Sequence, residues 1–206
     1  MKKIMMTLAA VAVAATMNAQ VWIGGELGLN STTNKVEASG VSTDNTLYNF
    51  TIAPEIGYNL DENWAVAIKL GFAHNEANAN AKELVKDYIP GLGNLMTNSF
   101  SINPYVRYTF CKAGNFSAFV DGGINYASTH VNNLSEYINN INSFGVSINP
   151  GIAYAVSEKV GLVAHIGDLS YNTMWCKAKK VDFEVSQNGF NFGLWNSISF
   201  GAYYNF

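Results

Sequence analysis

The last stretch of the chain alternates apolar residues with small or polar residues, with a period of two. From Phe190 to Phe206 almost every second residue is apolar, and the residues between them include Asn191, Gly193 and Ser197. A period of two places the apolar residues on one face of a β-strand, whereas a helix repeats every 3.6 residues. The alternation is also longer than in an ordinary soluble strand. The pattern therefore predicts a long strand with one apolar face.

Seven further segments show the same alternation. Strands of about ten to twelve residues are long enough to cross a bilayer at a tilt. Together with the C-terminal segment they predict an all-β fold, an eight-stranded antiparallel up-and-down transmembrane β-barrel. The seven segments cover residues 21–30, 48–59, 63–73, 99–110, 116–127, 143–155 and 159–171.

The composition of the chain agrees with a membrane environment. Only 13% of its 206 residues are charged, whereas soluble domains carry roughly 25%. A membrane-spanning helix needs about 18 apolar residues, and the longest predominantly apolar run, Ile4–Ala15, is shorter. The aromatic content of 13% excludes a disordered chain, and the presence of 2 cysteines excludes a disulfide scaffold.

The N-terminus has the form of a secretory signal peptide. Lys2 and Lys3 precede the apolar run, and a short segment ending in Ala19 follows it. We expect cleavage after Ala19, so that residues 1–19 are the signal peptide and residues 20–206 form the outer-membrane barrel domain. The chain has 12 basic and 15 acidic residues, and the basic ones are scattered, so we expect no nucleic-acid partner.

The apolar face of the strands is expected to point outward, toward lipid. The other face carries mainly Gly, Ala, Ser, Asn and Thr, which suits a narrow lumen better than a solvated exterior. A soluble barrel of the lipocalin type, with its apolar side chains inside, is the alternative. Aromatic residues gather near both ends of the apolar face, as they do at membrane interfaces. They are Tyr58, Trp64, Tyr108, Phe110, Phe116, Tyr154, Tyr204 and Phe206 at one end, and Phe50, Phe72, Phe100, Tyr126 and Phe144 at the other.

The connections between the predicted strands alternate between short and long. Short turns join every second pair of segments, and much longer loops join the remaining pairs, so that the loops gather at one rim of the barrel. The short turns are 60–62, 111–115 and 156–158, and the long loops are 31–47, 74–98, 128–142 and 172–189.

This layout, over residues 21–206, resembles the small eight-stranded outer-membrane β-barrels, namely the OmpA transmembrane domain and the OmpX-like, porin-family proteins. The resemblance implies short periplasmic turns, long extracellular loops and a place in the outer membrane of a Gram-negative bacterium. It also implies contact with outer-membrane lipid and lipopolysaccharide. The terminal Phe206, with Phe200 and Tyr204 on the same face, looks like the signal that the barrel assembly machinery recognises in such proteins.

A small set of ionisable residues falls on the inward phase of the predicted strands, at about one level of the lumen. Side chains fill the interior of an eight-stranded barrel, and buried ions must be paired or hydrogen-bonded. We therefore expect a salt-bridge network that plugs the lumen, and a polar lining for a narrow ion path or gate is the alternative. The residues are Glu26, Glu55, Lys69, Arg107, Asp121 and His165.

A weak internal repeat has the form Ile-x-Pro-x-(Ile/Val)-x-Tyr. It begins at Ile52, Ile102 and Ile148. Because proline has no N–H for the strand ladder, we expect bulges or weakened pairing at each copy. The simplest interpretation of the repeat is a recurring structural part without chemistry.

Two of the long loops contain helix-favouring segments, over residues 79–89 and 133–141. Their apolar residues lie at helical spacing. They could form an apolar ligand patch over the barrel mouth, lie in the lipid interface, or pack on each other and on the strands. These residues are Leu84, Val85, Tyr88, Ile89, Leu134, Tyr137, Ile138 and Ile141.

Catalytic and metal-binding patterns find little support in the sequence. His74, His130 and Asp168 are candidates for a lipid-modifying enzyme, but no spacing ties them to a nucleophile. The sequence has no Gly-rich phosphate loop, CxxC motif or His-rich cluster, so we expect no catalytic residue, no cofactor and no metal site. Cys111 and Cys176 fall at opposite rims of the predicted barrel and should not bond to each other.

The sequence thus favours a barrel with a filled lumen and a structural or surface-interaction role, exercised through extracellular loops. It does not identify the ligand of those loops. The alternative is a binding or uptake barrel for a small amphipathic or hydrophobic molecule, which a side opening among the upper strands would favour. A lipid-modifying enzyme is the third and least supported class.

Overall fold

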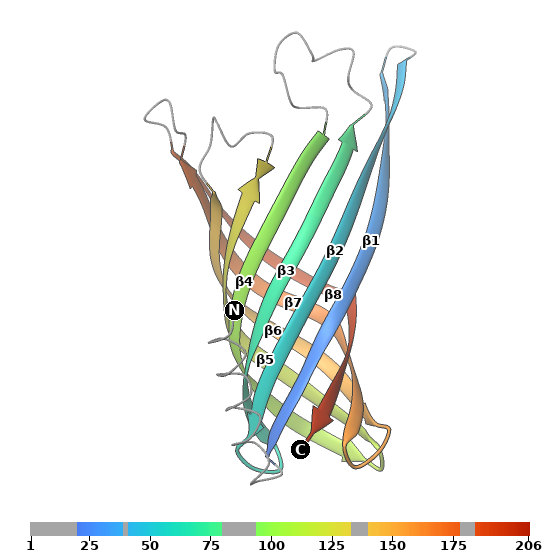
Figure 1. Cartoon of the computed structure of the whole chain (residues 1–206), viewed down its shortest axis with the longest axis vertical. Coiled ribbons are helices and arrows are strands. Elements are labelled where there is room, and N and C mark those ends of the chain that lie inside the picture. The colour runs from blue at the N-terminus through green and yellow to red at the C-terminus, as the bar shows by residue number, and fades with distance from the viewer. Residues whose placement is uncertain (1–19, 39–40, 80–93, 133–139, 178–183) are drawn as a thin grey trace, which may run out of the picture.

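Eight antiparallel strands form a closed barrel, and the predicted fold class is confirmed (Figure 1). The computed structural model describes residues 20–38, 41–79, 94–132, 140–177 and 184–206. Each strand pairs with the next one along the chain, and the last strand pairs with the first. The strands are β1 (Val21–Ala38), β2 (Val41–Asn59), β3 (Trp64–Ala79), β4 (Asn94–Ala113), β5 (Phe116–Val131), β6 (Ile141–Ala155), β7 (Val160–Lys177) and β8 (Glu184–Asn205).

Tight turns gather at one end of the barrel, which we call the short-turn end. The C-terminus lies at this end as well (Figure 1). Gly114 has a φ of 59°, the left-handed conformation that a two-residue hairpin turn requires. The opposite end is called the long-connection end. The tight turns are 60–63, 114–115 and 156–159.

Asp61 stabilises the first of these turns. Its Oδ1 atom accepts the backbone N–H of Asn63 at 2.7 Å and that of Trp64 at 2.8 Å. Because both hydrogen bonds favour the ionised carboxylate, the one from Asn63 most, the pKa of Asp61 lies below its ordinary value. The turn therefore uses a side chain to satisfy backbone donors that have no ladder partner.

The strands extend further toward the long-connection end than the alternation predicts. The loop predicted over 31–47 is wrong, because β1 and β2 remain paired as far as Ala38 and Val41. Strands β3, β4, β7 and β8 likewise take in residues assigned to loops. The added segments, such as 31–34, are polar, so they show no apolar alternation, although the backbone ladder does not depend on it. At the other end β4 includes Cys111–Ala113, which leaves a turn of two residues.

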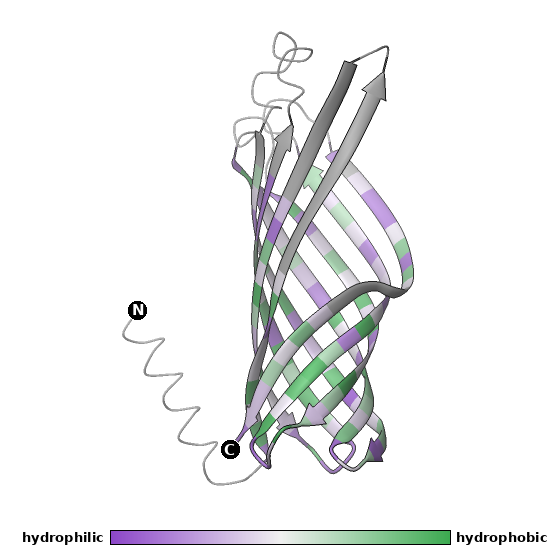
Figure 2. Cartoon of the chain, turned by 90° about the vertical axis from the view of Figure 1, so that its right-hand side faces the viewer, coloured by the Kyte–Doolittle hydropathy of each residue, from purple (hydrophilic) through white to green (hydrophobic). Residues whose placement is uncertain are grey.

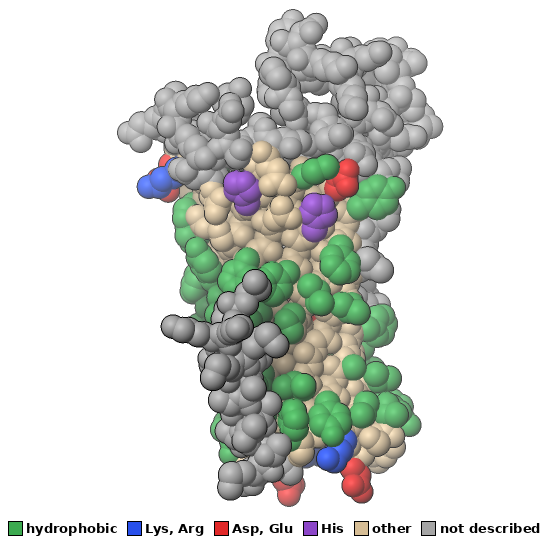
Figure 3. Space-filling model, in the orientation of Figure 1, with side chains coloured by type: hydrophobic (Ala, Val, Ile, Leu, Met, Phe, Trp, Pro, Cys, Tyr) green, Lys and Arg blue, Asp and Glu red, His purple; other side chains and the backbone are tan. Residues whose placement is uncertain are grey.

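The outer wall of the barrel is apolar, as predicted. Hydrophobic side chains cover the middle of the face shown in Figure 3, and charged side chains lie near its two ends. Aromatic rings meet across neighbouring strands, with centroids 4.5 Å apart for Trp64–Tyr108 and 5.3 Å apart for Phe72–Phe100. Of the helices in the described residues, none is long and apolar enough to cross a membrane. Polar side chains in the middle of the described strands, such as Lys69, Arg107 and Asp121, line the lumen, which is the reverse of a lipocalin-type barrel.

The three prolines of the repeat interrupt the hydrogen bonding at one height of the barrel. Pro54, Pro104 and Pro150 lie on β2, β4 and β6, and each is paired in register with the preceding strand. Toward the following strand the pairing skips each proline, because proline has no N–H. Between β6 and β7 the register also shifts, from Ile148 to Gly151. The weakened pairing predicted for the repeat is therefore present.

An asparagine before two of these prolines supplies the missing donor. Asn103 Nδ2 donates to the carbonyl oxygen of Ile124 at 3.0 Å, and Asn149 Nδ2 donates to that of Gly167 at 3.4 Å. Both carbonyls lie on the strand toward which the proline interrupts the ladder. The first repeat has Ala53 at this position, which cannot donate. The Asn-Pro pair is thus a structural unit in which a side chain replaces a backbone N–H.

Replacing Asn103 with alanine is expected to lower the free energy of unfolding by about 1 kcal/mol, because the Ile124 carbonyl loses its donor. Urea unfolding of the barrel in lipid vesicles, followed by tryptophan fluorescence, measures the change. Asn125→Ala is the matched control: its side chain also lines the lumen and forms no hydrogen bond in the described part of the chain. Equal losses in the two variants would contradict the role given to Asn103.

The seam between β1 and β8 is hydrogen-bonded only in its part nearest the short-turn end. The paired register covers six residues of β1, from Trp22 to Leu27, whereas β1 pairs with β2 along its whole length. Above Leu27, β8 shifts its register against β7 between His165 and Gly167. Beyond Leu27 and Phe200 the described residues include no further β1–β8 pair. Hydrophobic and hydrophilic residues alternate along the coloured parts of the strands (Figure 2).

Candidate functional site

Described residues line two cavities in the lumen, one toward each end of the barrel. The cavity toward the long-connection end has a volume of about 460 Å³, and we call it the upper cavity. The cavity of about 250 Å³ at the short-turn end, the lower cavity, is lined by turn residues such as Asp61. Lys69, Tyr105 and His165 line the upper cavity, whereas Arg107 and Phe119 line the lower one. The layer of side chains between the two cavities is therefore the feature that decides whether the lumen is continuous.

One half of this layer is built around Asp121. The Arg107 guanidinium donates to both carboxylate oxygens of Asp121, from Nε at 2.7 Å and from Nη2 at 2.8 Å. His165 Nε2 lies 2.8 Å from the same carboxylate. Arg107 and Asp121 are opposite each other in the β4–β5 register, so the strand pairing itself brings the two charges together.

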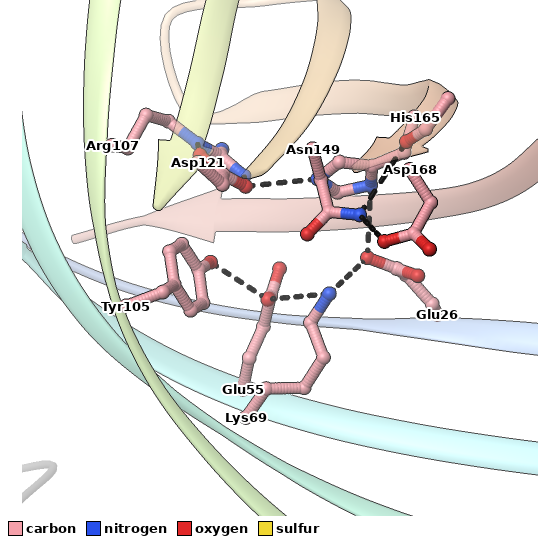
Figure 4. Close-up of polar contacts among 10 residues, drawn as sticks. Glu26, Glu55, Lys69, Tyr105, Arg107, Asp121, Asn149, His165 and Asp168 are labelled. Carbon is pink, nitrogen blue, oxygen red and sulfur yellow. Dashed lines mark hydrogen bonds and ion pairs between the residues drawn. The ribbon is translucent and has the colours of Figure 1, made fainter. Parts of the chain in front are cut away.

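The other half links His165 to Glu55 (Figure 4). His165 Nδ1 lies 3.2 Å from Glu26 Oε1, and Glu26 also binds the ammonium of Lys69. Lys69 Nζ lies 3.7 Å from Glu55 Oε2, which accepts the hydroxyl of Tyr105 at 2.8 Å. We call the seven residues connected by these contacts the lumen network. They are Arg107, Asp121, His165, Glu26, Lys69, Glu55 and Tyr105.

The charges of the lumen network balance only when His165 is protonated. Three carboxylates face two permanent cations, so a neutral imidazole would leave one negative charge uncompensated. The geometry agrees, because both ring nitrogens of His165 face a carboxylate oxygen and a neutral imidazole carries only one N–H. Buried ions are stable when each is paired, and each ion here has a partner within 4 Å.

Aromatic rings complete the layer, and glycines in the wall make room for them. A Cβ atom at Gly151 would overlap the ring of Phe119, and one at Gly57 would overlap the indole of Trp22. Phe119 is 1% exposed, and the Arg107 guanidinium lies 3.9 Å from its ring centroid, within cation–π distance. The lumen network and these rings together separate the upper cavity from the lower one.

The six ionisable residues singled out in the sequence all belong to this layer, and the structure adds Tyr105 and Phe119 to it. Tyr105 lies two residues from Arg107 on β4, so the alternation predicts that its side chain also points into the lumen. Phe119 stands two residues before Asp121 on the same phase of β5. A search of the inward phase for charged residues does not find either of them, because neither carries a charge.

A second polar cluster surrounds Asp168 in the upper cavity. Its carboxylate accepts hydrogen bonds from Asn149 Nδ2 at 3.0 Å, from Ser170 Oγ at 2.7 Å and from Asn191 Nδ2 at 2.7 Å. Asn172 Nδ2 in turn donates to Ser170 Oγ at 3.2 Å. The described groups that bind this carboxylate are all neutral.

A bulge turns Asp168 into the lumen. His165 and Asp168 both line the upper cavity, although strict alternation would place them on opposite faces. The register of β7 shifts against both β6 and β8 around Ile166 and Gly167. The residue that β7 gains at this bulge reverses the inward and outward placement of the residues that follow it. The alternation alone could not reveal this placement.

The structure does not bring the candidate catalytic residues together. His74 and His130 are exposed on the outer wall, where their Nδ1 atoms contact Asn98 Oδ1 at 2.8 Å and Asn140 Oδ1 at 3.0 Å, whereas Asp168 lies in the lumen. Cys111 is exposed near the short-turn end of β4, and Cys176 lies near the long-connection end of β7. Among the described residues, no group of three or more His, Cys, Asp or Glu side chains could hold a metal ion.

The loop patch falls almost entirely outside the described residues. Only Ile141 is described, as the half-buried first residue of β6. Phe200 and Tyr204 are exposed on the outer face of β8, and the Tyr204 and Phe206 rings meet edge to face with centroids 5.4 Å apart. The undescribed patch residues are Leu84, Val85, Tyr88, Ile89, Leu134, Tyr137 and Ile138.

Solved structures of small outer-membrane barrels resemble this fold. The crystal structure of the outer membrane protein OprG from Pseudomonas aeruginosa matches with a TM-score of 0.53 and 12% identity, over 91% of this chain and 96% of that one. The Neisserial surface protein A matches with a TM-score of 0.44 and 14% identity, over 92% and 98% of the two chains. The Escherichia coli outer membrane protein W matches with a TM-score of 0.44 and 14% identity, over 91% and 97%.

At these identities the likeness to OprG shows the fold and nothing finer. No curated protein sequence matches the chain. The sequence model of the family described as "Outer membrane protein beta-barrel domain" matches residues 4–206, nearly the whole chain. The apolar wall, the closed eight-stranded sheet and this match agree: the chain belongs to the outer membrane protein β-barrel domain family, whose place is the outer membrane of Gram-negative bacteria.

Proposed function

We propose that this protein is an uptake barrel for small amphipathic or hydrophobic molecules. A molecule enters the upper cavity from the long-connection end, which faces the outside, and leaves sideways between β1 and β8 into the membrane. The short-turn end then faces the periplasm. The observation that carries the proposal is the end of the β1–β8 pairing at Leu27 and Phe200.

The height of this point supports an open seam within the membrane. Six paired residues, at about 3.3 Å each and a tilt of about 40°, rise roughly 15 Å, which is less than the roughly 25 Å apolar band of such barrels. Phe50, one of the aromatic residues expected at the outer interface, lies opposite Leu29 on β1, above the last paired residue of the seam.

An open strand edge inside a membrane has a cost. Backbone N–H and C=O groups without partners are tolerated at membrane depth only where they line a water-filled space or protein. The upper cavity supplies such a space, because Ser199 of β8 and Thr51 of β2 both line it at this height. A barrel that serves only as a scaffold gains nothing from this arrangement, whereas lateral release requires it.

The lumen network supports the same direction of travel. It separates the upper cavity from the lower one, so a molecule in the upper cavity has no straight path to the short-turn end. The structural or surface-interaction role favoured by the sequence explains the filled lumen equally well, but not the open seam. The separated positions of His74, His130 and Asp168 give no support to a lipid-modifying enzyme.

Replacing Gly28 with tryptophan tests the lateral route. Gly28 is the next residue of β1 above the paired seam, and a Cβ added to it meets only Thr51, at 3.5 Å. Since an indole would fill the cavity side of the seam, uptake is expected to fall about tenfold or more. The readout is the initial fluorescence rise of N-phenyl-1-naphthylamine in cells with an intact outer membrane, per folded barrel.

The matched control is Gly122→Trp. Gly122 is exposed on β5, and a Cβ added to it meets open space, so the indole enters lipid away from the seam. This variant should take up the dye at the wild-type rate. Wild-type uptake by Gly28→Trp, or no uptake above barrel-free cells by the wild type, would refute the proposed function.

Contacts with lipid, lipopolysaccharide and the assembly machinery remain part of the same proposal. The apolar outer wall supports the first, and the apolar terminal strand with Phe200, Tyr204 and Phe206 supports the last.

A further inference from the structure

We propose that the upper cavity binds the ammonium group of a small amphipathic amine, with Asp168 as its partner. This inference names the substrate class of the proposed uptake function and rests on it for the fate of the molecule. The binding itself depends only on the cavity and on its charges.

Asp168 is the uncompensated charge of the lumen. Of the four inward carboxylates among the residues whose side chains the structure describes, Glu26, Glu55 and Asp121 each have a cationic partner within 4 Å. Asp168 has none within the part of the chain that the structure describes. Its three hydrogen-bond donors are amides and a hydroxyl, which orient the carboxylate but leave its charge in place. A cation in the upper cavity would supply the missing partner.

The rest of the upper cavity suits an ammonium group better than a metal ion or an anion. Its wall is rich in amide and hydroxyl groups that can accept an N–H, and part of the wall is apolar. The cations on its floor, Lys69 and the protonated His165, are already paired with carboxylates, so among the described residues no free positive charge remains to hold an anion. The neutral polar side chains that line the cavity include Ser147, Asn125, Asn172 and Ser101.

The position of Asp168 relative to the open seam explains why the amine would be amphipathic. Asp168 lies opposite Gly193 in the β7–β8 register, on the part of β8 that no longer pairs with β1. Gly193 is buried and carries no side chain that could separate the carboxylate from the seam. A head group on Asp168 therefore lies beside the exit, and an apolar tail can reach the membrane through it.

The test measures binding of propylamine, which is cationic at pH 7 and too short to partition strongly into lipid. The barrel is placed in lipid nanodiscs and titrated while amide resonances are followed by NMR. Propylamine is expected to shift resonances around Asp168 saturably, and 1-propanol, its neutral analogue, is not. Asp168→Asn keeps the size of the side chain and removes the charge, so the Kd for propylamine should rise about tenfold or more.

Asp61→Asn is the matched control, because it removes an exposed carboxylate at the far end of the barrel and should leave the Kd unchanged. Equal binding of propylamine and propanol by the wild type, or an unchanged Kd in Asp168→Asn, would overturn the inference. If Asp168→Asn does not fold, the comparison of the two ligands on the wild type decides. Uptake of the uncharged naphthylamine dye is measured separately. A closed seam would abolish dye uptake, whereas a missing amine site would abolish only the binding of propylamine.

Discussion

Replacing Asp121 with alanine should lower the free energy of unfolding by about 3–5 kcal/mol, the largest loss expected from any single change in the lumen network. The Asp121 carboxylate is shared by Arg107 and His165. Its removal leaves the buried Arg107 guanidinium without its ion-pair partner and leaves His165 with Glu26 alone. Urea unfolding in vesicles, with the heat-dependent shift in electrophoretic mobility as a second measure, gives the size of the loss.

A double-mutant cycle separates the pairing from the loss of packing. Arg107→Ala in the Asp121→Ala background should cost much less than Arg107→Ala alone, because the arginine has already lost its partner. Additive losses would show that the two residues act independently, which would contradict the network drawn from their geometry.

Replacing Phe119 with alanine should turn a silent barrel into a conducting one. The ring stands between the Arg107 guanidinium and the wall at Gly151 and lines the lower cavity. It also meets His165, which lines the upper cavity, with ring centroids 5.3 Å apart. Its removal joins the two water-accessible spaces, so the ionic current per inserted barrel in a planar bilayer should increase about tenfold or more. The wild type should show no sustained large current, since the lumen network and its rings fill the lumen.

Asn125→Ala controls for the conductance experiment, because it enlarges only the upper cavity. It should remain as silent as the wild type. A wild-type barrel that already carries a porin-like current would favour the gate interpretation of the network over the plug, and would weaken the argument for a sideways exit.

The alternation of residues was sufficient to predict the strands and the inward charges. Inward or outward placement follows from parity along a strand, so Glu55 and Lys69 could be assigned to the lumen without any structure, and they lie opposite each other in the β2–β3 register. Parity fails where the backbone gains a residue. Because of the bulge at Ile166 and Gly167, parity along β7 does not predict the inward position of Asp168.

Strand length and the β1–β8 seam could not be predicted from the pattern for a different reason. Toward the long-connection end the strands remain paired through residues that show no apolar alternation, so Ser31 or Thr46 gives no apolar signal of being in a strand. The meeting of the first and last strands depends on how the barrel closes. Alternation within β8 is the same whether or not Phe200 and its neighbours find a partner on β1.

The Asn-Pro and Ala-Pro steps have a mechanical consequence for the tube. Pro54, Pro104 and Pro150 weaken three of the seams between adjacent strands at one height, while the ladders within β1–β2, β3–β4 and β5–β6 continue past them. At the height of the prolines the wall consists of strand pairs with continuous hydrogen bonding, joined to one another by weaker pairing. It therefore resists flattening less than a continuous sheet would. The ions and rings inside it therefore act as a spacer that keeps the cross-section round.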